Sequence, residues 1–343
     1  MHPTLLGLLL ILWRGGIAVV LKSDVAPRCF STEYLSLIES GHFHCDKDWL
    51  ASPSSAALAH RCHSQGIGYW NSSFPTILTC QESKTSHAQI LTFDSPPHAS
   101  PDTAMAIQTL TTSVPPAGNH PSALQLHPYA FPIAIAQSHN VGPTRIEFYG
   151  FDSQTTKIHK IPTLVVSVPR HIGALGYAQF TESTIHMVGC GWNCATLTFW
   201  KAKVKGTIPD QFDMYMSART VDLLDPKGLD THVGGYNSLF LTSHCGTNEI
   251  MLMATHTVWL DIYKISNIGT QDVRLTKIRK RRVPWNLDHL LKPIFLEGVT
   301  MLDEWHLLAN PHDFGRENCP YPHVRCVKTV YQCRFFPSHV STW

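Results

Sequence analysis

The sequence predicts a mainly β fold built as a β-propeller-like repeat of four-stranded antiparallel sheets. Three observations predict it. Over residues 129–343, short runs rich in β-branched and aromatic residues alternate with turn signals, two stretches repeat the same order of runs, and an aromatic residue recurs at one place in the unit. The alternatives are a β-sandwich, or an α+β fold with a small cysteine-rich N-terminal domain.

Two units of four runs each carry the repeat, and both open with Gly-Tyr. The runs of the first unit are 177–180, 185–189, 196–201 and 212–216, and those of the second are 236–241, 250–254, 259–264 and 273–278. The third run of each unit ends with an aromatic residue followed by lysine, Trp200-Lys201 and Tyr263-Lys264. Four strands per unit is the arrangement of a propeller blade.

Parts of the same pattern lie on both sides of these units. The upstream runs are 131–135, 145–149 and 161–168, and the downstream runs, which fill the first three places, are 299–301, 305–308 and 327–331. Aromatic residues recur at Tyr149, Trp200, Tyr263 and Tyr331, at intervals of 51, 63 and 68 residues. The downstream unit lacks an obvious fourth strand, which the N-terminal part of the chain could supply together with one further blade.

Composition divides the chain into four segments: a signal peptide (1–18), a Cys-rich region (19–93), a Pro/Ser-rich linker or long loop (94–128) and the β-repeat domain (129–343). Within them we expect a helix over 54–63 and short strands over 74–80 and 104–110.

The N-terminus indicates secretion. Leu5 to Trp13 is an apolar run of nine residues, which is too short to span a bilayer and suits the hydrophobic part of a signal peptide. Gly16 and Ala18 place small residues where cleavage after Ala18 requires them. We therefore expect an extracellular protein without stable membrane insertion.

The even number of cysteines, ten, agrees with an oxidising compartment. The disulfide candidates are Cys29, Cys45, Cys62, Cys80, Cys190, Cys194, Cys245, Cys319, Cys326 and Cys333. Four precede residue 81 and six follow residue 189, which favours one bridged set at each end, with Cys45 and Cys62 as partners. A bridge between Cys190 and Cys194 would pin a β-turn, and Asn71 begins the sequon expected to be glycosylated.

The residues show no catalytic signature. GxSxG, HExxH, P-loop and dinucleotide motifs are absent from the sequence.

A formal net charge of +2 favours no nucleic-acid partner, and we expect no cofactor or metal. The leading hypothesis is thus a secreted non-catalytic binding protein that recognises a protein or glycan, through Trp192, Tyr69 and Trp70 near predicted loops. The alternative is a secreted hydrolase that acts on glycans, with carboxylates at the mouth of the propeller.

The charge run from Lys277 to Arg282 has three interpretations. It is expected to be a solvent-exposed outer strand whose cations protect a sheet edge, with Lys277, Arg279 and Arg281 on one face. A polyanion site and a dibasic processing site are the alternatives.

Two resemblances add to these expectations. The segment after residue 128 resembles secreted β-propeller proteins in general architecture. The N-terminal block, with Phe43-His-Cys45 and a following helix-like stretch, resembles the small ribonuclease-like effectors that plant-pathogenic fungi secrete. The second resemblance covers less than a quarter of the chain and implies no catalytic residues here. A role as a microbial effector is compatible with either function.

The mature chain is expected to begin at Val19 with few or no free thiols, because a cleaved leader delivers it to an oxidising compartment. Mass spectrometry of secreted material, alkylated with and without reduction, measures both. An intact Met1, or several cysteines that alkylate without reduction, would contradict secretion.

Overall fold

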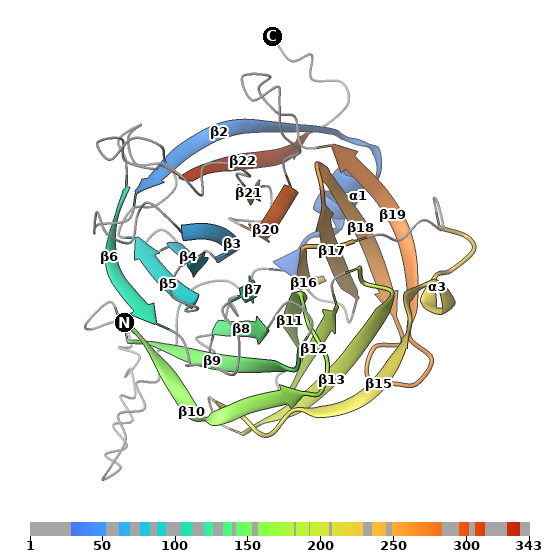
Figure 1. The fold of residues 1–343 in the computed structure, drawn as a ribbon. Coiled ribbons are helices and arrows are strands. Elements are labelled where there is room, and N and C mark those ends of the chain that lie inside the picture. Colours follow the sequence, from blue (N-terminus) through green and yellow to red (C-terminus); the bar gives the residue numbers. More distant parts are fainter. Residues whose placement is uncertain are drawn as a thin grey trace, which may run out of the picture.

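The computed structural model describes residues 29–52, 62–68, 76–82, 88–93, 104–111, 120–125, 133–138, 142–152, 157–181, 183–191, 193–205, 208–228, 235–244, 249–282, 295–301, 306–312 and 328–336. The described strands form four sheets in a ring around one axis (Figure 1), and the largest of them joins two four-stranded antiparallel units through a short parallel pairing of Ala51 and Ser52 with Ala104 and Met105, so that we describe five blades. This confirms the β-propeller-like prediction.

Strands follow one another outward from the axis in each blade. Blade 1 contains β3 (Cys62–Gly68), β4 (Thr76–Glu82), β5 (Ala88–Phe93) and β6 (Ala104–Thr111). Blade 2 contains β7 (His120–Gln125), β8 (Ile133–Ser138), β9 (Thr144–Asp152) and β10 (Lys157–Val168). Blade 3 contains β11 (Ala174–Thr181), β12 (Thr184–Cys190), β13 (Thr196–Lys205) and β15 (Asp213–Arg219), and the short β14 (Ile208–Pro209) also pairs with β13.

Blade 4 contains β16 (Ser238–His244), β17 (Ile250–His256), β18 (Trp259–Ser266) and β19 (Arg274–Arg282). Blade 5 contains β20 (Phe295–Met301), β21 (His306–His312), β22 (Lys328–Phe336) and, from the other end of the chain, β2 (His42–Ser52). A two-residue strand β1 (Cys29–Phe30), α1 (Thr32–Ser40) and α3 (Thr220–Leu223) complete the described elements. The repeat units of the sequence are blades 3 and 4.

The fifth blade is closed by the N-terminal strand, as expected. β2 pairs antiparallel with β22, and Figure 1 shows the two side by side, β2 in blue and β22 in red. β1 adds in parallel to the end of β16, where Phe30 lies opposite His244. The N-terminal segment therefore holds blades 4 and 5 at once.

A register shift marks the same place in every blade. The outer strand gains extra residues immediately before the aromatic residue of the third strand, which is Phe93, Tyr149, Trp200, Tyr263 or Tyr331. Lysine lies opposite this aromatic residue in three blades: Lys47, Lys160 and Lys277. The recurring aromatic residues of the sequence thus mark β-bulges, which bend the outer strand and strengthen its twist.

Three apolar clusters fill the spaces between neighbouring blades. One lies between blades 2 and 3 and includes Phe148 and Trp200, and a second lies between blades 3 and 4 and includes Phe199 and Leu252. The third joins α1 to blades 4 and 5. Strands β12, β16 and β17 are buried on both faces between these clusters, which explains why they are largely apolar.

A disulfide and an arginine reinforce the closure. Cys45 on β2 is bonded to Cys333 on β22. The Arg281 guanidinium, at the end of β19, donates hydrogen bonds to Ile38 O (3.2 Å) and Gly41 O at the C-terminus of α1. It also lies 5.9 Å from the ring centre of Phe335. A cation at this helix end satisfies free carbonyls and complements the helix dipole.

Several expectations need correction. Cys45 does not pair with Cys62, and its bond to Cys333 joins the two cysteine groups that we expected to be bridged separately. β3 replaces the end of the expected helix at 62–63, and β7 lies within the expected linker. The strands expected at 74–80 and 104–110 are confirmed as β4 and β6. The boundaries of the domains stay a prediction.

Arg281→Ala should destabilise the protein by about 2 kcal/mol, because two hydrogen bonds from a charged donor are lost at the closure. Arg274→Ala is the matched control, since Arg274 on the same strand forms an exposed ion pair with Asp272 and should cost less than about 1 kcal/mol. Urea unfolding measures both, and equal effects would contradict the role of Arg281.

Candidate functional site

One amide side chain joins three inner strands near the axis of the propeller. Gln125, on the inner strand of blade 2, is 2% exposed. Its Nε2 donates to Leu241 O (2.6 Å), and its Oε1 accepts from Tyr177 N (2.8 Å) and Leu241 N (3.0 Å). A single residue therefore joins the inner strands of blades 2, 3 and 4.

Glycines allow the inner strands to approach this closely. A Cβ atom on Gly176 would lie 3.2 Å from Gln125 Oε1 and 3.1 Å from Leu241 N. A Cβ atom on Gly298 would lie 2.7 Å from Ile67 N, so that β20 and β3 would have to separate. The axis at this depth is a packed core rather than an open channel.

One buried carboxylate lies between blades 3 and 4. Asp261, on the third strand of blade 4, is 1% exposed. Its Oδ2 accepts a hydrogen bond from Tyr236 (2.9 Å) and lies 3.0 Å from Lys277 Nζ and 3.3 Å from His256 Nε2. The Tyr236 and Tyr263 hydroxyls are also hydrogen-bonded to each other.

Neighbouring side chains set the ionisation of Asp261 and of the two tyrosines. Burial alone would raise the pKa of Asp261, but His256 and Lys277 outweigh it and hold that pKa below its usual value. Burial raises the pKa of Tyr263 to about 12, and burial with the neighbouring Tyr263 and Asp261 raises the pKa of Tyr236 further. The cluster is therefore an ionised carboxylate held by a lysine among neutral phenols.

A second buried carboxylate occupies the equivalent place in blade 2. Glu147 has no exposed surface; its carboxylate lies 2.5 Å from Lys160 Nζ and 3.0 Å from Arg145 Nε, and it accepts a hydrogen bond from Tyr149 (2.7 Å). Glu147 and Asp261 both stand two residues before the recurring aromatic residue. Both are paired with the lysine opposite that residue. Since each is buried and neutralised by a lysine, neither is placed to act on a substrate.

The basic run is not the exposed edge that the sequence predicts. β19 is the outer strand, but Lys277 is 2% exposed and Arg281 contacts α1. The register shift between Ile262 and Tyr263 places Lys277 and Arg279 on opposite faces, because they lie opposite these two neighbouring residues. The run therefore forms no single basic surface, and its pairing with β18 up to Arg282 disfavours processing there.

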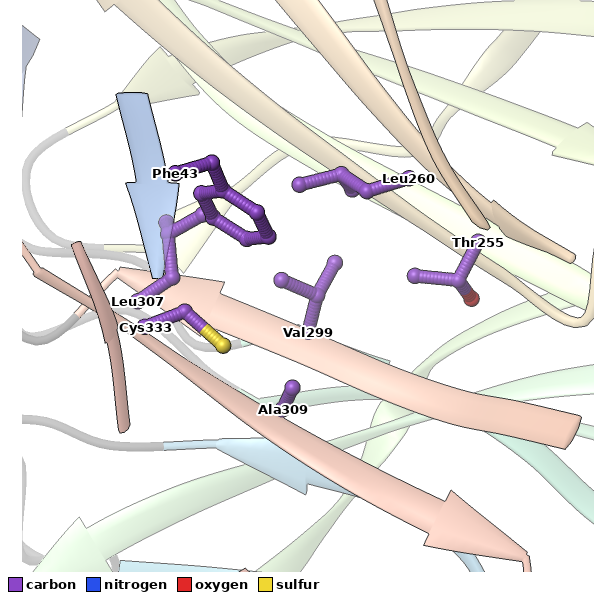
Figure 2. Close-up of a pocket in the computed structure, with 7 residues that line it drawn as sticks. All are labelled: Phe43, Thr255, Leu260, Val299, Leu307, Ala309 and Cys333. Atoms are coloured by element: carbon purple, nitrogen blue, oxygen red, sulfur yellow. The ribbon is translucent and has the colours of Figure 1, made fainter. Parts of the chain in front are cut away.

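A small cavity lies between blades 4 and 5 (Figure 2). It has about 10 Å³ of space for the centre of a water molecule, close to the smallest volume that holds one. Its lining is apolar except for the Thr255 hydroxyl. The lining residues are Phe43, Thr255, Leu260, Val299, Leu307, Ala309 and Cys333. This is a packing defect of the core rather than a ligand site.

The aromatic residues expected to bind a ligand, Trp192, Tyr69 and Trp70, lie outside the described residues, as does Asn71. The bond from Cys190 to Cys194 is confirmed. Within the described ranges no group of three His, Cys, Asp or Glu side chains could hold a metal ion, and no helix there is long and apolar enough to cross a membrane.

One acidic position on the axis escaped the sequence analysis. Glu297, on β20, is the only acidic residue in the five inner strands. It falls at a register shift, since Leu296 lies opposite Pro311 and Gly298 lies opposite Asn310. We had expected the first strand of this unit to begin at residue 299, which left Glu297 outside it.

Comparison with known proteins supports the fold and no more. No protein-family model and no curated protein matches the sequence. The α-L-arabinofuranosidase from Podospora anserina, in complex with cellotriose, has a TM-score of 0.50 at 9% identity, over 87% of this chain and 98% of that chain. This chain shares its fold. The catalytic domain of the Coprinopsis cinerea GH62 α-L-arabinofuranosidase has a TM-score of 0.44 at 9% identity, over 86% and 98% of the two chains.

This comparison corrects the expectation of a non-catalytic binding protein. The solved structure whose fold this chain shares is that of an α-L-arabinofuranosidase, not of a binding protein. A missing linear motif is weak evidence against an enzyme, because a fold does not fix a function and a site can combine residues from distant parts of a chain.

Lys277→Met should destabilise the protein by about 3–5 kcal/mol, because it leaves Asp261 buried without its lysine. The stabilisation from Asp261, whose folded pKa is lowered, is present above the unfolded pKa of about 3.9 and is lost as pH falls through the folded pKa. In the variant this pKa rises because Lys277 no longer offsets burial, so the variant should lose less stability than wild type as pH falls, and the difference between the two should be smaller at pH 3 than at pH 8. Urea unfolding between pH 3 and 8 measures both effects.

Lys264→Met is the control, since the ion pair of Lys264 with Glu249 is about 40% exposed on both sides and should contribute less than about 1 kcal/mol. A variant Lys277→Met as stable as this control would contradict the buried pair.

Proposed function

We propose that the chain is a secreted glycoside hydrolase that acts on glycans, with its active centre at the end of the propeller where the inner strands begin. The observation that carries this proposal is the fold shared with an arabinofuranosidase over nearly the whole length of that enzyme. The signal-peptide pattern and the two disulfides described above support secretion.

Glycoside hydrolysis usually needs two carboxyl groups on opposite sides of the scissile bond. Glu147 and Asp261 are committed to buried lysine pairs and do not serve. Glu297 is the candidate for one of the two, because it is the sole acidic residue of the inner strands and lies at a bulge. Bulges are common beside active sites, where they redirect a side chain.

The second carboxyl group is expected from the connections at the same end. The chain passes from outer to inner strands and from second to third strands at this end, since Phe295 at the start of β20 lies opposite His312 at the end of β21. Asp230, Asp288 and Asp313 fall in such connections and outside the described residues. The Gln125 amide joins the inner strands deeper along the axis, so we expect a sugar to enter and leave from the same end of the propeller.

Glu297→Gln should lower kcat/KM by at least about 100-fold, the usual loss when a catalytic acid or base is removed, and should leave the melting temperature close to that of wild type. Release of reducing sugar from a panel of polysaccharides and 4-nitrophenyl glycosides measures activity. Glu249→Gln, which changes a carboxylate in a surface ion pair, is the matched control and should retain activity.

Two outcomes would overturn this assignment. A folded wild type that hydrolyses no member of the panel would contradict the hydrolase. Full activity of Glu297→Gln would place the catalytic carboxyl group elsewhere.

A further inference from the structure

Three neighbouring blades differ in one buried position. The residue two places before the recurring aromatic residue is Glu147 in blade 2, Thr198 in blade 3 and Asp261 in blade 4, and each is almost fully buried. In blades 2 and 4 this residue is a carboxylate that neutralises a cation. Blade 3 has a hydroxyl there instead.

Blade 3 nevertheless keeps a cation at this position. Arg170, which follows β10 on the way to β11, donates from Nη2 to Thr198 Oγ1 and to Ser217 Oγ (2.6 Å). Tyr236, from the corresponding connection between blades 3 and 4, reaches Asp261 in the same way. Blade 3 thus has an arginine where this connection supplies a tyrosine to blade 4, and Met214 lies where blade 4 has Lys277. Blade 3 keeps a cation at the joint but lacks the carboxylate.

The consequence is a positioned arginine with no counter-ion among the described residues. Within the described part of the chain Arg170 has no carboxylate partner, and the hydrogen bonds that it makes there use Nη2 alone. Its side chain is half-buried, and neither Nε nor Nη1 is a buried atom lacking a partner. The two hydroxyls hold Nη2, and no described residue bonds to the other donors of the guanidinium.

We propose that Arg170 is an anion subsite that binds the carboxylate of an acidic glycan, such as a uronic acid residue. A planar guanidinium held in place suits a carboxylate, which can accept two parallel N–H groups. Arg170 lies in a connection from an outer to an inner strand, at the end of the propeller where Glu297 is placed. The choice of a glycan as the ligand rests on the proposed hydrolase function. The anion site itself rests only on the contacts of Arg170 in blade 3.

Titration with sodium glucuronate, glucose and sodium sulfate, followed by calorimetry or NMR, tests the subsite without requiring turnover. The wild type should bind glucuronate and not glucose. Arg170→Gln should weaken glucuronate binding at least about 10-fold, as loss of a charge-assisted pair implies. Arg219→Gln is the matched control, since Arg219 is exposed and already lies 3.8 Å from Asp222.

Thr198→Asp supplies the carboxylate that blades 2 and 4 have at this position. It should pair with Arg170 internally and abolish glucuronate binding in a folded protein. If this variant does not fold, Arg170→Gln still decides the question. Unchanged binding in Arg170→Gln would overturn the subsite, and equal binding of sulfate would overturn its preference for a carboxylate.

The two proposals fail separately. Glucuronate binding in a protein that hydrolyses nothing would retain the subsite and reject the hydrolase. Hydrolysis that is unaffected by Arg170→Gln on both acidic and neutral glycans would retain the hydrolase and reject the subsite.

Discussion

The pairing of β2 with β22 is the constraint on which the ring depends. It joins strands from opposite ends of the chain, and the bond between Cys45 and Cys333 spans a sequence separation of 288 residues. Without β2 the fifth blade would expose the edge of β22, and blades 4 and 5 would lose α1 and part of the cluster between them. Arg281 adds an electrostatic contact at this junction, which explains why a strongly charged run is partly buried.

The sequence reveals the repeat because a propeller is built from local hairpins. Each blade contains its apolar runs, turns and recurring aromatic residue within about 50–70 residues, and a repeat of that length can be recognised in a sequence. Blades 3 and 4 and the closing strand were predictable for this reason. Contacts between distant segments were not predictable. They include the bond from Cys45 to Cys333 and the contacts of Gln125 near the axis.

The candidate site was harder to predict than the fold. Strand periodicity places Lys277 and Arg279 on one face, but a one-residue bulge reverses the second of them. The buried carboxylates show the same difficulty, since Glu147 and Asp261 are ordinary acidic residues until the register pairs each with a lysine. Only the comparison of equivalent positions in three blades shows that Thr198 and Arg170 depart from the rule.

The shared closing blade also bears on how the protein is made. A chain that emerges from its N-terminus presents β2 long before β22 exists, so β2 must wait with an unpaired edge while blades 1 to 4 assemble from local contacts. The pairing of β2 with β22 is then a late folding step between residues far apart in sequence, and the ring is complete only when it forms. A chain truncated before residue 328 would therefore leave an open ring with an exposed edge, which is a substrate for chaperones and proteases rather than a smaller propeller.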